Sequence, residues 1–415
     1  MTTETISTIS AITKTQFTAP VMRWLAYKDN PTFGMVSKRE DWEGDNYIVP
    51  LQTEANQSGG VTIAIAQAGL FPDTYKRFTL TRLQDFSVAR VNGEVIDAAS
   101  SNKGAFVNAF KRAMEGAIFT AKRSAAIHQF RNGTGSRGQI SAGSNVNTAT
   151  VTLARLSDIT NMSLGLTIQL ANTDGGTLRS AGANAQITKI DRLNGTITFS
   201  DVLTNLIAAA QAGDFILRSG DNNGVIHGMG AWVPTATPSN TLFNGTDRSV
   251  DPVRLAGQFV NCTSLNYREA IITGMSRIKV ENGDPDTVIL NPLGTAILAK
   301  EMEGKSIYFK QVEVAATVKG SKATVGYDAF ETQLDGSKVR VISDVNCPNG
   351  DGWVTQFDTW FFASILAVPR ILEYQGVSQF VHVTNDDAVE IRVGYRGDIG
   401  NDGPSYSVHL FNMAT

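Results

Sequence analysis

The longest regular pattern of apolar positions in the chain lies between Ser100 and Gly138. Apolar side chains recur there at steps of three and four residues, which is the spacing of one face of an α-helix. Ser101 or Asn102 can cap the start, and Asn132-Gly133 tolerates the left-handed conformation that ends a helix. At about 1.5 Å per residue, residues 103–131 would form a helix of roughly 40–45 Å. We call this predicted element the spine helix; its apolar face is formed by Phe106, Ala109, Phe110, Ala113, Ala117, Ala121 and Ala125.

Before the spine helix the pattern has a period of two. Residues 47–51 and residues from 78 to 88 alternate as β-strands do, and they enclose a Gly-rich loop. This pattern predicts an extended β-hairpin over residues 46–90. An isolated two-stranded hairpin is marginally stable in water, so we expect a neighbouring subunit to cover it.

After the spine helix, residues 139–217 contain alternating segments separated by Asp/Asn-Gly turns, which predicts a small β-barrel or β-sandwich. Three helices are then expected, at 253–261, at 267–280 and from Pro292 to about Glu303, with a short strand at 288–290. The rest of the chain has strand patterns. The sequence therefore predicts an α+β protein.

Composition and charge exclude several classes of protein. The 415 residues are 42% hydrophobic and 18% charged, and no apolar run approaches the ~20 residues that span a membrane. A net charge of -3 lacks the basic excess typical of sequence-independent nucleic-acid binding. The Thr/Ser-rich start lacks a secretion-signal pattern, so we expect no export. Cys262 and Cys347 are too few for a disulfide framework, and we expect free thiols.

No recognisable active site or cofactor site emerges. Residues 133–138 fit G-x-G-x-x-G, but they follow a helix instead of preceding one, so we interpret these glycines as the helix exit. The four histidines are scattered without metal-ligand spacing, and the Asp residues near 221, 351 and 386 favour turns. The tripeptide at 396–398 matches a cell-adhesion motif that is short enough to arise by chance. We therefore predict no catalytic, cofactor-binding or metal-binding residues.

The order of these parts resembles a major capsid protein of tailed bacteriophages, whose fold is shared with encapsulins. The most specific stretches are Asn92 to Gly138, NGEVIDAASSNKGAFVNAFKRAMEGAIFTAKRSAAIHQFRNGTGSRG, and Asp344 to Gly350, an Asp followed by Pro and Gly between strands. The resemblance implies an N-terminal arm (1–45), an extended hairpin loop (46–90), a peripheral domain with the spine helix (91–138), an inserted β domain (139–220), a linker (221–250), an axial domain (251–345) and a return to the peripheral domain (346–415).

The resemblance also implies a function. Such proteins assemble in the host cytoplasm into pentamers and hexamers, and these form the icosahedral shell of a virion around double-stranded DNA. Scaffolding, portal and decoration proteins are further partners in that family, and no membrane is involved. The expected intersubunit contacts on the hairpin loop are Glu54, Asn56, Gln57, Gly59, Lys76 and Arg77. Some members cross-link a loop lysine to a neighbour, but residues 54–60 contain no lysine, so we predict non-covalent assembly.

Other interpretations remain open at this point. An encapsulin-like compartment would carry protein cargo in place of DNA. A β-rich glycan-binding or tail-associated virion protein would explain residues 139–220 but gives no reason for the spine helix. An unrecognised hydrolase would use turn-borne Asp residues. Contact with DNA, if it occurs, should be weak and non-specific, with Lys14, Arg23, Lys111 and Arg112 as candidates.

Overall fold

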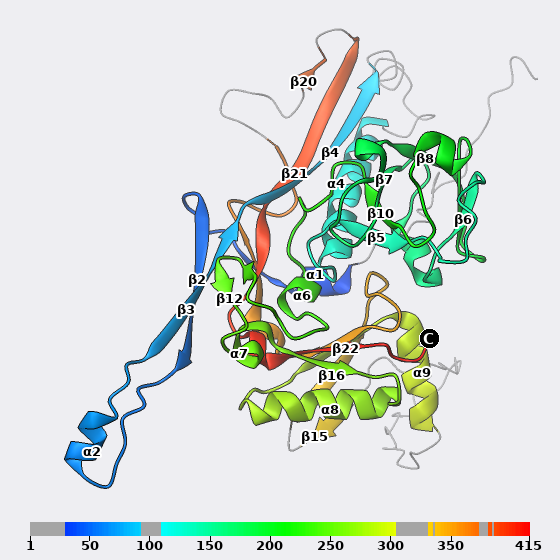
Figure 1. Ribbon diagram of the computed structural model, residues 1–415. Helices are drawn as coiled ribbons and strands as arrows, with labels where there is room; N and C mark the ends of the chain where they lie inside the picture. Colours follow the sequence, from blue (N-terminus) through cyan, green and yellow to red (C-terminus); the bar gives the residue numbers. More distant parts are fainter. Residues whose placement is uncertain (1–29, 93–108, 304–330, 335–336, 373–380, 384–385) are drawn as a thin grey trace, which may run out of the picture. The chain divides into compact units, whose positions relative to one another are not determined.

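The computed structural model describes residues 30–92, 109–303, 331–334, 337–372, 381–383 and 386–415 (Figure 1). These residues form two units. Unit 1 contains the described parts of 86–123 and 369–394, and unit 2 contains those of 30–85, 124–368 and 395–415. The predicted N-terminal arm falls mostly outside the described residues. Its last part forms α1 (Pro31–Met35) and β1 (Ser37–Arg39) in unit 2.

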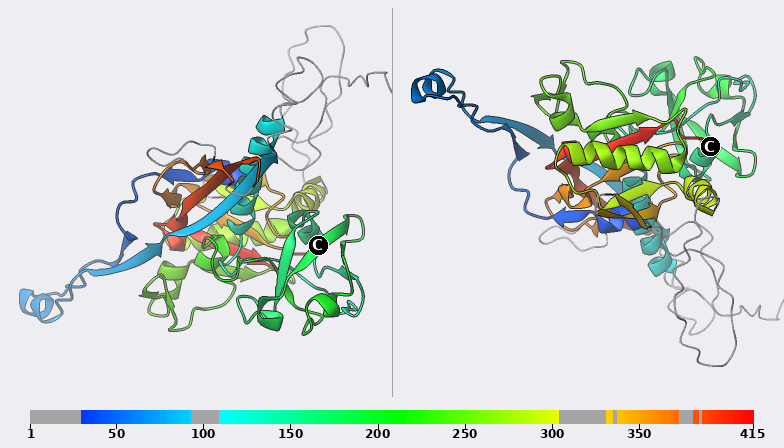
Figure 2. Two further views of the ribbon diagram at one scale, coloured as in Figure 1. Left: turned by 90° about the horizontal axis from the view of Figure 1, so that it is seen from above. Right: turned by 90° about the horizontal axis from the view of Figure 1, so that it is seen from below.

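A two-stranded ribbon follows in unit 2. β2 (Asn46–Glu54) pairs antiparallel with β3 (Thr74–Thr81), and the register shifts between Gln52 and Glu54. A short helix, α2 (Ile63–Ala68), lies at the end of this ribbon (Figures 1 and 2), with the Thr62 side chain accepting a hydrogen bond from the Ile65 amide. The ribbon is shorter than predicted because β3 ends at Thr81 and β4 (Leu83–Asn92) pairs with β21 (Ala388–Asn401) instead.

The predicted spine helix is α4 (Ala109–His128). Its expected start, near Lys103, lies outside the described residues, and its end comes three residues before the predicted Arg131. Gly133 has φ +84°, so the predicted left-handed residue lies a short turn beyond the helix. The G-x-G-x-x-G segment indeed leaves a helix and enters a strand, β5 (Ser136–Gln139).

Residues 136–218 form a closed six-stranded barrel. The strand order is β5-β10-β7-β8-β9-β6, and a bridge between Ile140 and Leu153 joins the two outer strands. The barrel encloses its own apolar core, which includes Ile168, Leu170 and Ile197. Of the two predicted alternatives, the structure therefore has the barrel. Its further elements are β6 (Thr150–Thr152), η1 (Leu156–Asn161), β7 (Thr167–Ala171), η2 (Arg179–Gly182), β8 (Ala185–Asp191), β9 (Thr196–Phe199), α5 (Leu203–Leu206) and β10 (Phe215–Arg218).

A second six-stranded sheet of unit 2 packs against helices. Its order is β13-β22-β17-β14-β16-β15, with β13 (Gln258–Asn261), β22 (Ser407–Phe411), β17 (Gly352–Thr355), β14 (Thr287–Leu290), β16 (Ser337–Ser343) and β15 (Glu331–Leu334). α8 (Tyr267–Val280) contacts this sheet closely at Gly274, where an added Cβ would lie 2.9 Å from Val354. α9 (Pro292–Glu303) has the predicted bounds.

One predicted helix is wrong in extent. α7 (Pro252–Ala256) ends five residues before the expected Asn261, and β13 begins immediately afterwards. The cause is Gly257, whose φ of +67° and ψ of -165° only glycine adopts without strain.

Strands β1, β4, β18, β19 and β20 belong to a sheet built on β21. In unit 2, β1 runs parallel to β18 (Trp360–Ser364), and β18 pairs with the last part of β21. In unit 1, β19 (Arg370–Ile371) and β20 (Val381–His382) pair with the first part of β21. The small elements of unit 2 are α6 (Met229–Trp232), β11 (Leu242–Phe243), β12 (Thr246–Asp247), η3 (Phe357–Thr359) and η4 (Pro404–Tyr406).

Candidate assembly surface

The root of the β2–β3 ribbon is covered by its own chain. Phe78 is fully buried, and its ring lies 4.9 Å from that of Trp232. The outer edge of β3 is also occupied, because the Thr79 amide donates to the carbonyl of Asn244 at 2.8 Å. The expectation that a neighbour must cover the whole hairpin is therefore wrong for its root.

The end of the ribbon is different. α2 contains no buried residue, and a group of large apolar side chains around it is exposed to solvent. We call this group the tip patch: Val61 (96% exposed), Ile63 (78%), Ile65 (52%), Leu70 (64%), Phe71 (56%) and Tyr75 (62%). Several large apolar side chains exposed close together in the chain are typical of an interaction site.

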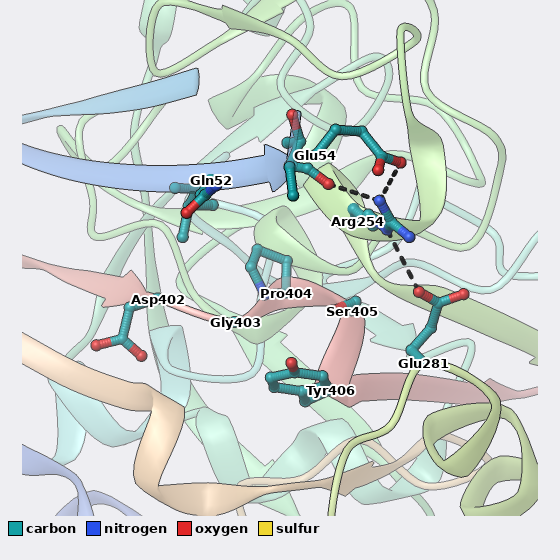
Figure 3. Close-up of a pocket in the computed structure, with 12 residues that line it drawn as sticks. Gln52, Glu54, Arg254, Glu281, Asp402, Gly403, Pro404, Ser405 and Tyr406 are labelled. Carbon is teal, nitrogen blue, oxygen red and sulfur yellow. Dashed lines mark hydrogen bonds and ion pairs between the residues drawn. The ribbon is translucent and has the colours of Figure 1, made fainter. Parts of the chain in front are cut away.

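Arg254 of unit 2 contacts the ribbon at the last residues of β2. The Arg254 side chain, from α7, contacts the Glu54 carboxylate and donates to the Thr53 carbonyl at 2.5 Å (Figure 3). Its Nε also lies 3.8 Å from Asp251 and 3.6 Å from Glu281. Arg254, Glu54 and Glu281 line a pocket of about 490 Å³ that β2 shares with the segment from Asp402 to Tyr406.

The predicted contact residues all lie on this ribbon, but their environments differ. Glu54 is held by Arg254, and the Arg77 carbonyl accepts a hydrogen bond from the Thr246 hydroxyl. The Asn56 amide donates to Asp73 at 2.6 Å, and the Gln57 amide donates to the Phe71 carbonyl at 3.1 Å. Gly59 is exposed, and Lys76 is half-buried opposite Leu51. The structure thus places some of them in contacts within the chain.

Sequence reasoning missed the tip patch, which lies between the residues it selected. The signal was present as two short apolar stretches, Ile63-Ala64-Ile65 and Leu70-Phe71, in a segment otherwise rich in glycine. Six residues are too few to show helical periodicity, so the sequence predicts only a loop where the structure has α2.

The predicted apolar face of the spine helix is only partly described. In unit 1, Ala117 and Ala121 are buried against Ile391 and Val393 of β21, and Ala113 is half-buried. Phe106, Lys14 and Arg23 lie outside the described residues. Phe110, Lys111 and Arg112 belong to α4, but their side chains are not among those described.

A buried group of charges lies at the root of the barrel, and sequence reasoning gave no hint of it. Arg218, on β10, contacts Asp85 at 2.6 Å and Asp221 at 2.8 Å. Arg137, on β5, and the Nε2 of His128, the last residue of α4, each lie 3.4 Å from Asp221. We call these five residues the charge cluster. It joins the entry and exit strands of the barrel to the rest of unit 2.

The charge cluster shifts the pKa values of Asp221 and His128. Burial raises the pKa of Asp221, but His128, Arg137 and Arg218 outweigh it and hold that pKa at about 2. Burial lowers the pKa of His128, so its imidazole is neutral at pH 7. Asp221 lies in a turn as predicted, since the Gly224 amide donates to its carbonyl at 3.1 Å, and its buried side chain has an ionic role in addition.

The remaining candidate motifs are structural in unit 2. Asp398, the last residue of the adhesion-like tripeptide, is fully buried and lies 2.7 Å from the Nδ1 of His227. Its carboxylate is therefore not accessible to an external receptor. Within the described ranges, no His, Cys, Asp and Glu side chains group as metal ligands would, and no helix is both long and apolar enough to cross a bilayer.

In unit 2 the described residues thus form an α+β body and a ribbon whose apolar end is exposed to solvent. No protein-family model matches the chain, and no curated protein matches its sequence. Solved structures do match. The chain superposes on one from the Cyanophage A-1(L) capsid asymmetric unit with a TM-score of 0.50 and 11% identity, covering 96% of this chain and 99% of that one.

A second match is to the capsid of an empty GTA particle, with a TM-score of 0.50 and 9% identity over 97% of this chain and 96% of the other. The chain therefore has the major capsid fold of tailed bacteriophages. The resemblance inferred from the sequence is confirmed at the level of the fold, and the similarity extends over nearly the whole chain.

Proposed function

We propose that this protein is a major capsid protein that assembles into pentamers and hexamers, which form an icosahedral virion shell around double-stranded DNA. The observation that carries the proposal is the tip patch on a chain that has the capsid fold over nearly its full length. Closed symmetry would let every copy cover its tip patch by the same contact. The role is structural, without catalysis, and assembly would take place in the host cytoplasm.

The β2–β3 ribbon is the proposed intersubunit element. Its apolar end would supply most of the contact energy, since burial of apolar area contributes about 25 cal/mol per Å². Glu54, Asn56, Gln57, Gly59, Lys76 and Arg77 would form the polar surroundings of that contact. With a net charge of -3, contact with packaged DNA would be weak and non-specific.

Electron microscopy of the expressed chain tests this proposal. We expect closed shells from the natural sequence and only unassembled subunits from the double variant Ile63→Glu, Ile65→Glu, because two carboxylates would have to be buried at the contact. The matched control is Ile63→Leu, Ile65→Leu, which keeps the surface apolar and should assemble. Near-ultraviolet circular dichroism checks that the Glu variant keeps its fold. Normal shells from that variant would contradict the proposal.

The contents of the shells separate the packaging role from that of a protein compartment. Shells from infected or induced cells should protect DNA from nuclease. Shells that contain a second protein and no DNA would assign the chain to an encapsulin-like compartment instead.

A further inference from the structure

Unit 2 contains a second pocket, remote in sequence from the ribbon. It has a volume of about 440 Å³ and is lined by residues of the barrel and of β17 and β22. Small-molecule sites of proteins typically have this size and a lining of hydrophobic and aromatic side chains with a few polar groups. Here the aromatic walls are Phe130, Phe215, Phe243 and Trp353.

One lining residue carries an unusual charge. Arg248 is only 9% exposed, and its Nη1 donates to the carbonyls of Ala231 and Trp232 at 2.9 and 3.0 Å. Its guanidinium lies 4.0 Å from the centre of the Phe243 ring. Among the residues that the structure describes, no carboxylate forms an ion pair with it. Burial lowers the pKa of Arg248 to about 10, and no acidic neighbour opposes this effect.

The other charged residues of the pocket are already engaged. Arg131 pairs with Asp158 at 2.8 Å, and Asp351 pairs with Arg155 at 2.9 Å. Asp174 accepts hydrogen bonds from Asn132 and Thr134, at 2.6 and 2.5 Å. A buried cation without a counter-charge is costly. Arg248 is therefore the charged lining residue that still lacks an oppositely charged partner. Its Nε is buried and has no hydrogen-bond partner in the described structure.

We propose that this pocket binds a carboxylate attached to an aromatic or apolar group. The carboxylate would pair with Arg248, and the attached group would lie between the aromatic walls. A single guanidinium matches a single negative charge, whereas Asp174 and Asp351 in the lining disfavour a doubly charged phosphate. The carboxylate has two possible sources, a free small acid or an acidic side chain of a second copy of this chain.

Calorimetric titration of the full-length chain with naphthalene-2-carboxylate and its neutral counterpart, naphthalene-2-carboxamide, tests the proposal. We expect the carboxylate to bind about tenfold more tightly or better, because a hydrogen bond between two charged groups is stronger than one to a neutral group. Arg248→Gln should abolish this preference. Arg254→Gln, which removes a guanidinium outside the pocket, should leave it unchanged. Equal binding of the two probes, saturable binding of neither, or a preference that survives in Arg248→Gln would overturn the proposal.

A second variant keeps the proposal testable if Arg248→Gln does not fold. Phe215→Ala removes a half-buried wall from the barrel side. It should weaken both probes to the same extent and keep the preference for the carboxylate. Loss of the preference in Phe215→Ala would place the charge recognition elsewhere and overturn the assignment to Arg248.

The two sources are distinguished by testing unassembled chains and shells separately. If the natural ligand is a free acid, both forms bind the carboxylate probe. If a neighbouring copy supplies the carboxylate, only unassembled chains bind it, and the probe slows shell formation. Binding by the unassembled chain does not depend on the proposed capsid function, so the two proposals can fail independently.

Discussion

The charge cluster carries no net charge, since two carboxylates face two guanidinium groups and a neutral imidazole. Asp221 is its central member, in contact with Arg137, Arg218 and His128. In Asp221→Asn, the two arginines would remain buried with Asp85 as the one carboxylate beside them. Breaking a buried pair in this way typically destabilises by about 3–5 kcal/mol.

We therefore expect Asp221→Asn to lower the free energy of unfolding by that amount, measured by urea denaturation of unassembled chains. The control is Asp45→Asn, which breaks the exposed Arg82–Asp45 pair and should cost less than about 1 kcal/mol. Similar losses in the two variants would show that the cluster is not a stabilising centre.

The same cluster predicts a pH dependence. The folded pKa of Asp221, about 2, lies below its ordinary value of 3.8, so its contribution is complete above pH ~4 and is lost as the pH falls toward 2. The folded pKa of His128 is also lowered, so its contribution is complete above pH ~6.5 and falls below that. Urea midpoints should thus fall in acid, and the loss near pH 3 should be smaller in Asp221→Asn. A flat profile from pH 7 to 3 would contradict this assignment.

At the scale of single elements, Gly257 ends α7 and starts β13. A Cβ at this position would lie 2.7 Å from the Pro404 carbonyl oxygen, in addition to the strain of a positive φ. We expect Gly257→Ala to destabilise the chain by about 1–3 kcal/mol in thermal or urea unfolding. Gly34→Ala is the control, because Gly34 lies in α1 with open space around it and should be neutral or slightly stabilising.

The Arg254 contact should set the mobility of the ribbon. In Arg254→Gln, we expect faster amide hydrogen exchange in β2 near Thr53 and Glu54, because the contact from α7 is lost. Arg82→Gln, which removes an exposed ion pair at the ribbon root, should leave exchange at these residues unchanged. Equal protection in Arg254→Gln and the natural chain would show that the contact does not restrain the ribbon.

Local signals made some elements predictable. α8 and α9 have their expected bounds because both starts are marked. A capping box of Asn266 and Glu269 marks the start of α8, and Pro292 marks that of α9. α7 was extended too far because apolar residues continue past Gly257 at helix-compatible spacing. The charge cluster could not be predicted from the sequence, because Arg218 and Asp85 are 133 positions apart and only the folded chain brings them together. The Arg248 pocket was missed for the same reason.

At the scale of the whole molecule, the assembly should be held by non-covalent contacts alone. Cys262 and Cys347 are buried free thiols, and residues 54–60 contain no lysine for a cross-link. Denaturing electrophoresis of shells without reductant should therefore give one band at 44.6 kDa. A ladder of larger species would show covalent joining and contradict this expectation.

The closure of the barrel has one more consequence. The chain enters it through β5 and leaves through β10, and these two strands are antiparallel neighbours, with Phe215 opposite Gln139. The chain therefore enters and leaves the barrel at two neighbouring strands. A foreign domain whose own termini are adjacent could therefore be exchanged for the barrel between these two strands.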